Sequence, residues 1–302
     1  MIVLTNKKNN ILREKRRKKL KALLKNKCKI KLIEAHNGIS ARIASDSHYE
    51  TNGGKKEFDG IWVSSLTCSA SKGLPDIELD CLIKRIDTVD EILLSTNLPV
   101  IVDVDTGGSP ENFKFMCAKL EQIGVSAVVI EDKSNNKKNS LLINAHHDLE
   151  DPYVVCEKIN TAKDNCLTDD FLIFARIESL IAKAGMDDAI KRAVIYNNQS
   201  SADGIVIHSN KGDPIEIFEF INKYKELDCK LPLICIPTTY SHIKSEDLFD
   251  KGIDIVIYAN HLLRASVHAM INTCDLILKN DRTKEADESS CYPVASLLKL
   301  VN

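Results

Sequence analysis

The chain has 302 residues, of which 44% are hydrophobic and 28% are charged, so it is long enough to bury one large α/β core or two small ones. Its net charge of −2 excludes a strong overall electrostatic preference for nucleic acid or for acidic surfaces.

The basic residues are concentrated at the N-terminus. Residues 1–31 contain thirteen Lys or Arg and one acid, so the rest of the chain carries about −14. Such a run can bind nucleic acid or a membrane surface, or it can be a solvated, partly helical extension. Because no aromatic residues interleave the charges, we favour an extension whose Leu20, Leu23 and Leu24 contact the body, and we expect no nucleic-acid partner. The expected division is a basic N-terminal extension, 1–29, and a single domain, 30–302.

The cysteine pattern and the hydropathy bear on location. Ten cysteines are scattered along the chain and no pair has CxxC spacing, which is typical of reduced thiols in a cytoplasmic protein. No signal-peptide-like apolar segment precedes the basic run, and no apolar stretch is long enough to span a bilayer. We therefore expect a cytoplasmic protein without a membrane partner.

Eight short apolar runs, most of them rich in Val and Ile, alternate with helical patterns. The runs lie at 30–33, 60–63, 99–102, 127–130, 171–175, 204–207, 232–236 and 253–258. The helical patterns include 110–123, 151–162, 185–198, 213–225 and 245–251, and Asp213-Pro214 resembles an N-cap followed by Pro at the first helical position. Residues 45–59 are expected to be a polar surface loop. The alternation predicts a (β/α)8 TIM-type barrel of parallel strands. A doubly wound sheet is the alternative, although no GxGxxG follows the first run.

The third apolar run ends in two carboxylates, Asp103 and Asp105, before Gly107-Gly108. Alternation along a strand would send both carboxylates to the same side. Two such charges in a poorly solvated mouth are costly unless a cation lies between them, and hard oxygen ligands suggest Mg²⁺ or Mn²⁺. The alternative is a solvated turn acid followed by a helix cap.

Polar residues also follow the other predicted strands, at the rim where barrel enzymes place their chemistry. They offer acids for a metal, and Arg and His for a phosphoryl or carboxylate group. The polar loop at 134–140 is either a lid over this rim or a solvated connection. The rim residues include Glu34, His36, Ser64, Ser65, Asp76, Glu131, Arg176, Glu178, His208, Ser209 and Asn260.

Seven motifs in order between about residues 30 and 280 carry a family resemblance. They are EAHNGISAR (34–42), WVSSL (62–66), DVDTG (103–107), EDK (131–133), KKNS (137–140), ARIE (175–178) and AN (259–260). Together they resemble the phosphoenolpyruvate mutase family of the isocitrate lyase/phosphoenolpyruvate mutase superfamily. The resemblance implies an isomerase that interconverts phosphoenolpyruvate and 3-phosphonopyruvate, forming the P–C bond in the first step of phosphonate biosynthesis. It also implies a homo-oligomer, a dimer or tetramer, in which the helix at 261–278 is exchanged between subunits. A decarboxylase is expected downstream to draw off the phosphonopyruvate.

The same resemblance implies roles for individual residues. Asp103 would bind Mg²⁺ directly, and Asp105 and Glu131 would hold it mainly through water. Asp76 matches the nucleophile, and Lys137 matches a lid residue that closes over the phosphoryl group. The other implied catalytic residues are Asn139 in the lid, Arg176 and His208. The implied substrate-binding residues are Trp62, Ser64, Ser65, Leu66 and Ser209.

Three other functions compete with this one. Phosphonopyruvate hydrolase would use the same metal site and deliver the phosphoryl group to water, but Lys138-Asn139-Ser140 favours the mutase. A carbon–carbon lyase of the superfamily would carry a catalytic Cys in the lid, whereas residues 131–140 contain no Cys, Gly or His. An inactive binding barrel, or an RNA-associated protein using the basic extension, is the alternative from a different class.

Overall fold

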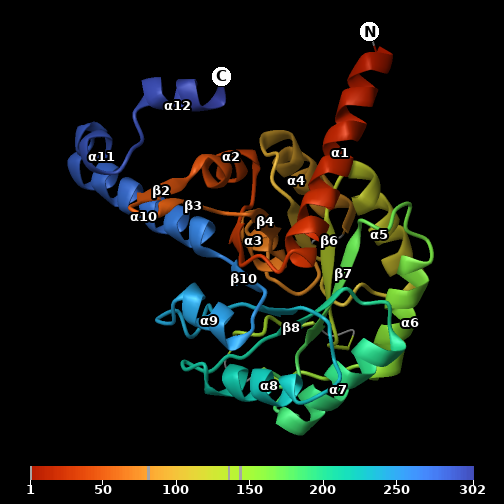
Figure 1. The fold of residues 1–302 in the computed structure, drawn as a ribbon. Coiled ribbons are helices and arrows are strands. Elements are labelled where there is room, and N and C mark those ends of the chain that lie inside the picture. Colours follow the sequence, from red (N-terminus) through yellow and green to blue (C-terminus); the bar gives the residue numbers. More distant parts are fainter. Residues whose placement is uncertain (1, 80–81, 135–136, 143–144) are drawn as a thin grey trace.

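The computed structural model describes residues 2–79, 82–134, 137–142 and 145–302, and it shows a closed barrel of eight parallel strands surrounded by helices (Figure 1). The strands are β1 (Ile30–Glu34), β4 (Gly60–Val63), β5 (Val100–Asp103), β6 (Ala127–Glu131), β7 (Leu172–Ile177), β8 (Gly204–Ile207), β9 (Leu233–Cys235) and β10 (Ile255–Tyr258). Each pairs with its neighbour in chain order, and β1 closes the ring by pairing with both β4 and β10. The predicted TIM-type barrel is confirmed.

Helices connect the strands on the outside of the barrel. They are α2 (Gly38–Asp46), α3 (Ser65–Ala70), α4 (Leu82–Ser95), α5 (Pro110–Ile123), α6 (Pro152–Lys163), α7 (Met186–Gln199), α8 (Ile215–Lys225) and α9 (Ser245–Lys251). Helix α5 has the predicted limits because its ends carry clear signals: Ser109 caps its first turn, Pro110 is its first residue and Gly124 ends it at φ 108°. Helix α8 begins two residues later than predicted, because Pro214 is the N-cap residue, and Asp213 accepts the N–H of Ile215 at 3.0 Å.

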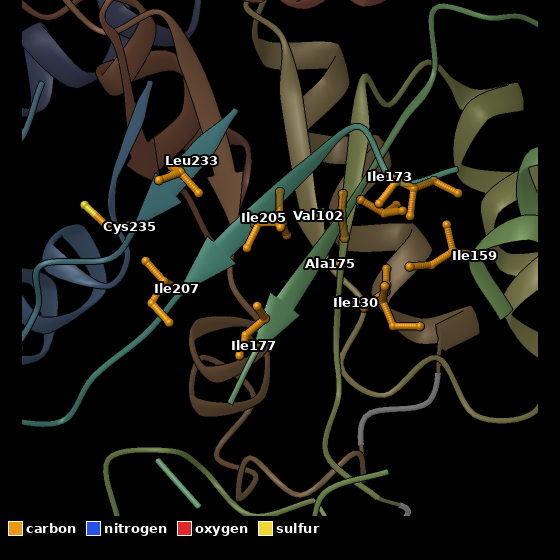
Figure 2. Packing of buried hydrophobic residues seen from close by; sticks show 14 of the residues in the cluster. Val102, Ile130, Ile159, Ile173, Ala175, Ile177, Ile205, Ile207, Leu233 and Cys235 are labelled. Atoms are coloured by element: carbon orange, nitrogen blue, oxygen red, sulfur yellow. The ribbon is translucent and has the colours of Figure 1, made fainter. Parts of the chain in front are cut away.

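The barrel strands are mostly apolar because both faces are buried, and the charged residues Asp103, Glu131 and Arg176 lie at or next to the carboxyl ends of their strands. Alternate residues of β6 divide between two clusters: Val128 and Ile130 pack outward, and Ala127 and Val129 pack inward. Figure 2 shows the outer cluster, in which Ile130 and Ile173 lie near Ile159 of α6.

A helix at the N-terminus, α1 (Ile2–Lys25), packs against the inner cluster, and its N-terminal half projects away from the barrel (Figure 1). Leu20 is fully buried among the inward-facing strand residues, and Leu23 and Leu24 pack beside it, as expected. Buried Arg16 donates to the carbonyls of Leu93 and Thr96 at the end of α4, and Arg17 donates to the carbonyl of Glu121 in the last turn of α5. Cations at helix C-termini offset the unpaired carbonyls, so part of the basic run has a structural role.

The expected loop at 45–59 is instead a β-hairpin of β2 (His48–Thr51) and β3 (Gly54–Glu57). The two strands are joined by Asn52-Gly53, a pair that favours tight hairpin turns and that the interpretation as a loop overlooked.

Three helices follow the barrel: α10 (His261–Asn280), α11 (Lys284–Ser289) and α12 (Val294–Val301). Apolar side chains of α10 and α12 are exposed, including Val267, Met270, Ile271, Leu278, Leu297 and Leu298. The structure contains a single chain, so exchange of this region between subunits stays a prediction. Within the described ranges, no helix is both long enough and apolar enough to cross a membrane.

Candidate active site

A small cavity of about 50 Å³ lies at the carboxyl ends of the barrel strands. Eleven of the thirteen predicted site residues line it: Trp62, Ser64, Ser65, Leu66, Asp76, Asp103, Glu131, Lys137, Asn139, Arg176 and His208. The barrel explains this convergence, since loops far apart in sequence meet at one rim. Lys137, Asn139, Ser140 and Leu141, from the predicted lid and the residue after it, also line the cavity. Residues 135–136 of the predicted lid lie outside the described residues.

The two acids after β5 face one region, but not by strand alternation. The strand ends at Asp103, and Asp105 lies in a turn with a left-handed backbone, at φ 55°. The backbone N–H of Asp105 donates to Asp103 Oδ1 at 3.1 Å, and Gly107 and Gly108 continue the turn at positive φ. The prediction that alternation orients both carboxylates was therefore wrong, because the strand is two residues too short.

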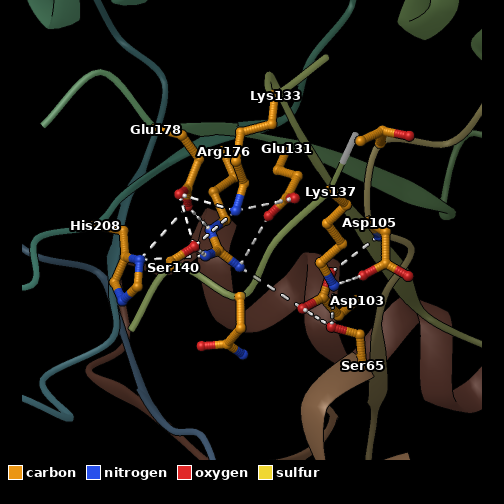
Figure 3. A network of polar contacts seen from close by, with 12 residues as sticks. Ser65, Asp103, Asp105, Glu131, Lys133, Lys137, Ser140, Arg176, Glu178 and His208 are labelled. Carbon is orange, nitrogen blue, oxygen red and sulfur yellow. Dashed lines mark hydrogen bonds and ion pairs between the residues drawn. The ribbon is translucent and has the colours of Figure 1, made fainter. Parts of the chain in front are cut away.

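Lys137 lies among the acidic side chains, as Figure 3 shows. Its Nζ donates to Ser65 Oγ at 2.8 Å, to Asp76 Oδ1 at 2.9 Å and to Asp105 Oδ1. Burial would lower the pKa of Lys137, but Asp105 and its neighbours outweigh burial and raise it, so the ammonium stays charged. One lid cation thus neutralises acids from two different loops.

Asp76 is fixed by the same lid segment. Its Oδ1 accepts from Lys137, and its Oδ2 accepts from Asn139 Nδ2 at 2.6 Å. Asn139 Oδ1 in turn accepts the N–H of Leu141 at 2.9 Å, which orients the amide. Both oxygens of the carboxylate therefore point at donors on the lid.

A second cluster surrounds Arg176 at the end of β7, on the other side of Asp103 in Figure 3. The Arg176 Nε pairs with Glu178, and its Nη2 donates to Ser140 Oγ at 3.0 Å and lies 3.2 Å from His208 Nδ1. Glu178 also accepts from Ser140 at 2.8 Å and lies 3.4 Å from Lys133 Nζ. Burial and Arg176 hold the pKa of His208 below its usual value, which keeps the imidazole neutral near pH 7.

Glu131 is the least satisfied acid of the site. It is 2% exposed, and its Oε1 accepts no hydrogen bond, although Lys133 Nζ lies 3.3 Å from it. Burial raises the pKa of Glu131 to about 7. An incompletely paired buried carboxylate fits a divalent cation, which would supply the missing charge. Among the residues that the structure describes, Lys137 lies between the acids, and no three His, Cys, Asp or Glu side chains are arranged as ligands of one metal ion.

Two predicted residues lie outside the cavity lining. Asp105 contacts the site through Lys137, whereas Ser209 is buried and donates to Glu216 at 2.7 Å.

The sequence reasoning missed two residues that organise the acidic turn. Arg85 on α4 donates to the carbonyl of Asp103 and to the carboxylate of Asp105. Glu78 accepts from the backbone N–H and the hydroxyl of Thr106, both at 2.8 Å. Neither residue comes directly after a predicted strand, so the pattern of polar residues at the strand ends did not predict them. Glu178 was noted at the rim but not counted among the site residues.

Comparison with known proteins identifies the family and the fold. The sequence model of the phosphoenolpyruvate phosphomutase family matches residues 20–278. The phosphoenolpyruvate phosphomutase of Tetrahymena pyriformis is 34% identical over 263 residues, covering 87% of this chain and 83% of the relative. The crystal structure of the phosphoenolpyruvate phosphomutase of Streptomyces platensis subsp. rosaceus superposes with a TM-score of 0.86 at 34% identity, covering 94% of each chain. A phosphonopyruvate hydrolase in complex with oxalate and Mg²⁺ superposes with a TM-score of 0.84 at 29% identity, covering 95% of this chain and 94% of the hydrolase.

Proposed function

The chain belongs to the phosphoenolpyruvate phosphomutase family, and from that membership we propose that it is an isomerase that interconverts phosphoenolpyruvate and 3-phosphonopyruvate. The observation that carries the proposal is the pair of hydrogen bonds between the lid and Asp76. The two carboxylate oxygens of Asp76 accept hydrogen bonds from Lys137 at 2.9 Å and from Asn139 at 2.6 Å. The reaction moves a phosphoryl group from oxygen to carbon on one substrate. A lid that fixes the group nearest the phosphorus and keeps water out suits that transfer.

The carboxylate donors suit a divalent cation, Mg²⁺ or Mn²⁺, which Asp103 would hold directly and Asp105 and Glu131 would hold mainly through water. Bound there, it would supply positive charge that stabilises an enolate oxygen. Ser65 and Leu66 open α3, so their backbone N–H groups have no acceptor within that helix and can hold the substrate carboxylate.

In this proposal, cationic and amide side chains contact the phosphoryl end of the substrate. Arg176 and Lys137 offset the charge of the transferring phosphoryl group, and Asn139 orients it. Asp76 either receives the phosphoryl group covalently or steadies it during transfer. His208, kept neutral beside Arg176, can donate one hydrogen bond without adding charge.

A second candidate is phosphonopyruvate hydrolase, because a protein of that activity shares the fold and the same general scaffold. The hydrolase would need a water molecule where Asn139 now contacts Asp76, so the 2.6 Å hydrogen bond favours the mutase. A carbon–carbon lyase is disfavoured because residues 131–140 contain no Cys.

The test is ³¹P NMR of the purified protein with Mg²⁺ and phosphonopyruvate. We expect the phosphonate signal to be replaced by that of phosphoenolpyruvate. Inorganic phosphate and pyruvate, with no phosphoenolpyruvate even at early times, would establish the hydrolase instead.

Assembly and pathway follow from the same proposal. The apolar face of α10, with Met270 and Ile271 exposed by 56% and 58%, would be covered by exchange with a neighbouring subunit in a dimer or tetramer. Because phosphoenolpyruvate is favoured at equilibrium, a decarboxylase that consumes phosphonopyruvate would follow in phosphonate biosynthesis. We place the reaction in the cytoplasm, in keeping with the scattered cysteines.

A further inference from the structure

Arg85 is a buried cation on α4 that the proposed chemistry does not use. Its side chain is 4% exposed, and its guanidinium makes two directed hydrogen bonds. Nη1 donates to the main-chain carbonyl of Asp103 at 2.8 Å, and Nη2 donates to Asp105 Oδ2 at 2.7 Å. Burying a guanidinium is costly, and both bonds go to the turn that carries the acidic residues.

We propose that Arg85 is a positioning residue that sets the direction of the Asp103 and Asp105 carboxylates toward the divalent cation. This inference rests on the metal site of the proposed function. A planar fork with fixed donors can hold a carbonyl and a carboxylate at once, which a single ammonium group cannot do in the same geometry.

The backbone conformation of this turn is unusual, and the contacts of Arg85 stabilise it. Asp105 has a left-handed backbone conformation, at φ 55°, which residues other than glycine adopt infrequently. Arg85 binds the turn on both sides of Val104: it donates to the main-chain carbonyl of Asp103, two residues before Asp105, and to the Asp105 carboxylate itself. With Oδ2 committed to Arg85, only Oδ1 of Asp105 remains for the cation, and Lys137 occupies that oxygen here.

The competing explanation is a purely structural ion pair, which would affect folding stability but not metal affinity. Arg17 offers a matched control, because it is also buried and its Nη1 donates to the carbonyl of Glu121 at 2.7 Å, and neither residue lines the cavity. Arg85→Lys and Arg17→Lys keep the charge and remove the fork, so both should lower the melting temperature.

The experiment is calorimetric titration of Mn²⁺ into the metal-free full-length protein. We expect Arg85→Lys to bind Mn²⁺ about 10–100-fold more weakly than the wild type, as losses of outer-shell contacts typically do, while Arg17→Lys binds normally. Arg85→Gln is the second variant. Loss of the positive charge should by itself tighten Mn²⁺ binding, so weaker Mn²⁺ binding by this variant would be due to the lost positioning of the acids. The inference is overturned if either Arg85 variant is folded and binds Mn²⁺ as tightly as the wild type or more tightly. It is also overturned if the wild type does not bind Mn²⁺. Because the titration needs no turnover, a failed mutase assay with normal Mn²⁺ results would refute only the proposed function.

Discussion

Replacing Asn139 with alanine should slow formation of phosphoenolpyruvate and divert part of the phosphoryl group to water. The substitution removes the 2.6 Å hydrogen bond from the lid to Asp76 Oδ2 and leaves a gap over the carboxylate. Water can then approach the phosphorus from the side that the amide covers.

The size of the effect follows from the type of bond. A hydrogen bond to a charged group contributes about 1.5–3 kcal/mol. If the transition state depends on this bond, its loss corresponds to a rate lower by roughly 10- to 150-fold. Lys137 still holds Asp76 Oδ1, so the turnover should fall and not vanish.

The assay is ³¹P NMR with phosphonopyruvate, following phosphoenolpyruvate and inorganic phosphate together. Asn160→Ala is the control, since Asn160 on α6 makes an amide hydrogen bond of 2.9 Å to the carbonyl of Gln199, outside the cavity lining. An Asn139→Ala enzyme with the wild-type rate and no added phosphate would refute the reasoning about the lid.

Three further outcomes are expected. Asp76→Ala should abolish turnover in the NMR assay while Mn²⁺ still binds, and retained turnover would exclude Asp76 as the nucleophile. Glu178→Gln should lower the free energy of unfolding by about 3–5 kcal/mol, because it leaves Arg176 and its neighbours without their shared acid, and an unchanged thermal transition would contradict this. Burial raises the pKa of Glu131 from 4.5 to about 7, so the folded metal-free protein binds an extra proton between these values and loses stability as the pH rises through them. The measurement is thermal denaturation across this pH range. The stability of the wild type minus that of Glu131→Gln should fall as the pH rises, and a rise would contradict the reasoning.

The barrel was predictable because its signal is repeated. Eight apolar runs gave eight strands within a few residues, since a parallel strand buried on both faces needs apolar residues at every position. The hairpin at 48–57 was missed because both of its strands are exposed and charged, and only Asn52-Gly53 marks it. Patterns of burial cannot reveal a strand pair that buries almost nothing.

The site was predictable where residues follow strands and not where they act from elsewhere. Asp103 and Glu131 are the last residues of their strands and Arg176 is the last but one, so the rim pattern placed all three at the cavity. Arg85 reaches the site from a helix, and its importance lies in two contacts that no spacing along the chain encodes. The turn at Asp105 likewise depends on where β5 stops, which a pattern fixes only to within a residue or two.

The packing of α1 sets an order of events during synthesis. This helix leaves the ribosome before the barrel does, yet it binds a carbonyl that is made much later: Lys21 donates to the carbonyl of Asp169, 148 residues further along the chain. At ordinary elongation rates the helix would wait roughly 7–30 s for that partner. During this interval Leu20, Leu23 and Leu24 have no barrel interior to enter, so the nascent chain exposes these leucines within a basic segment until the barrel forms.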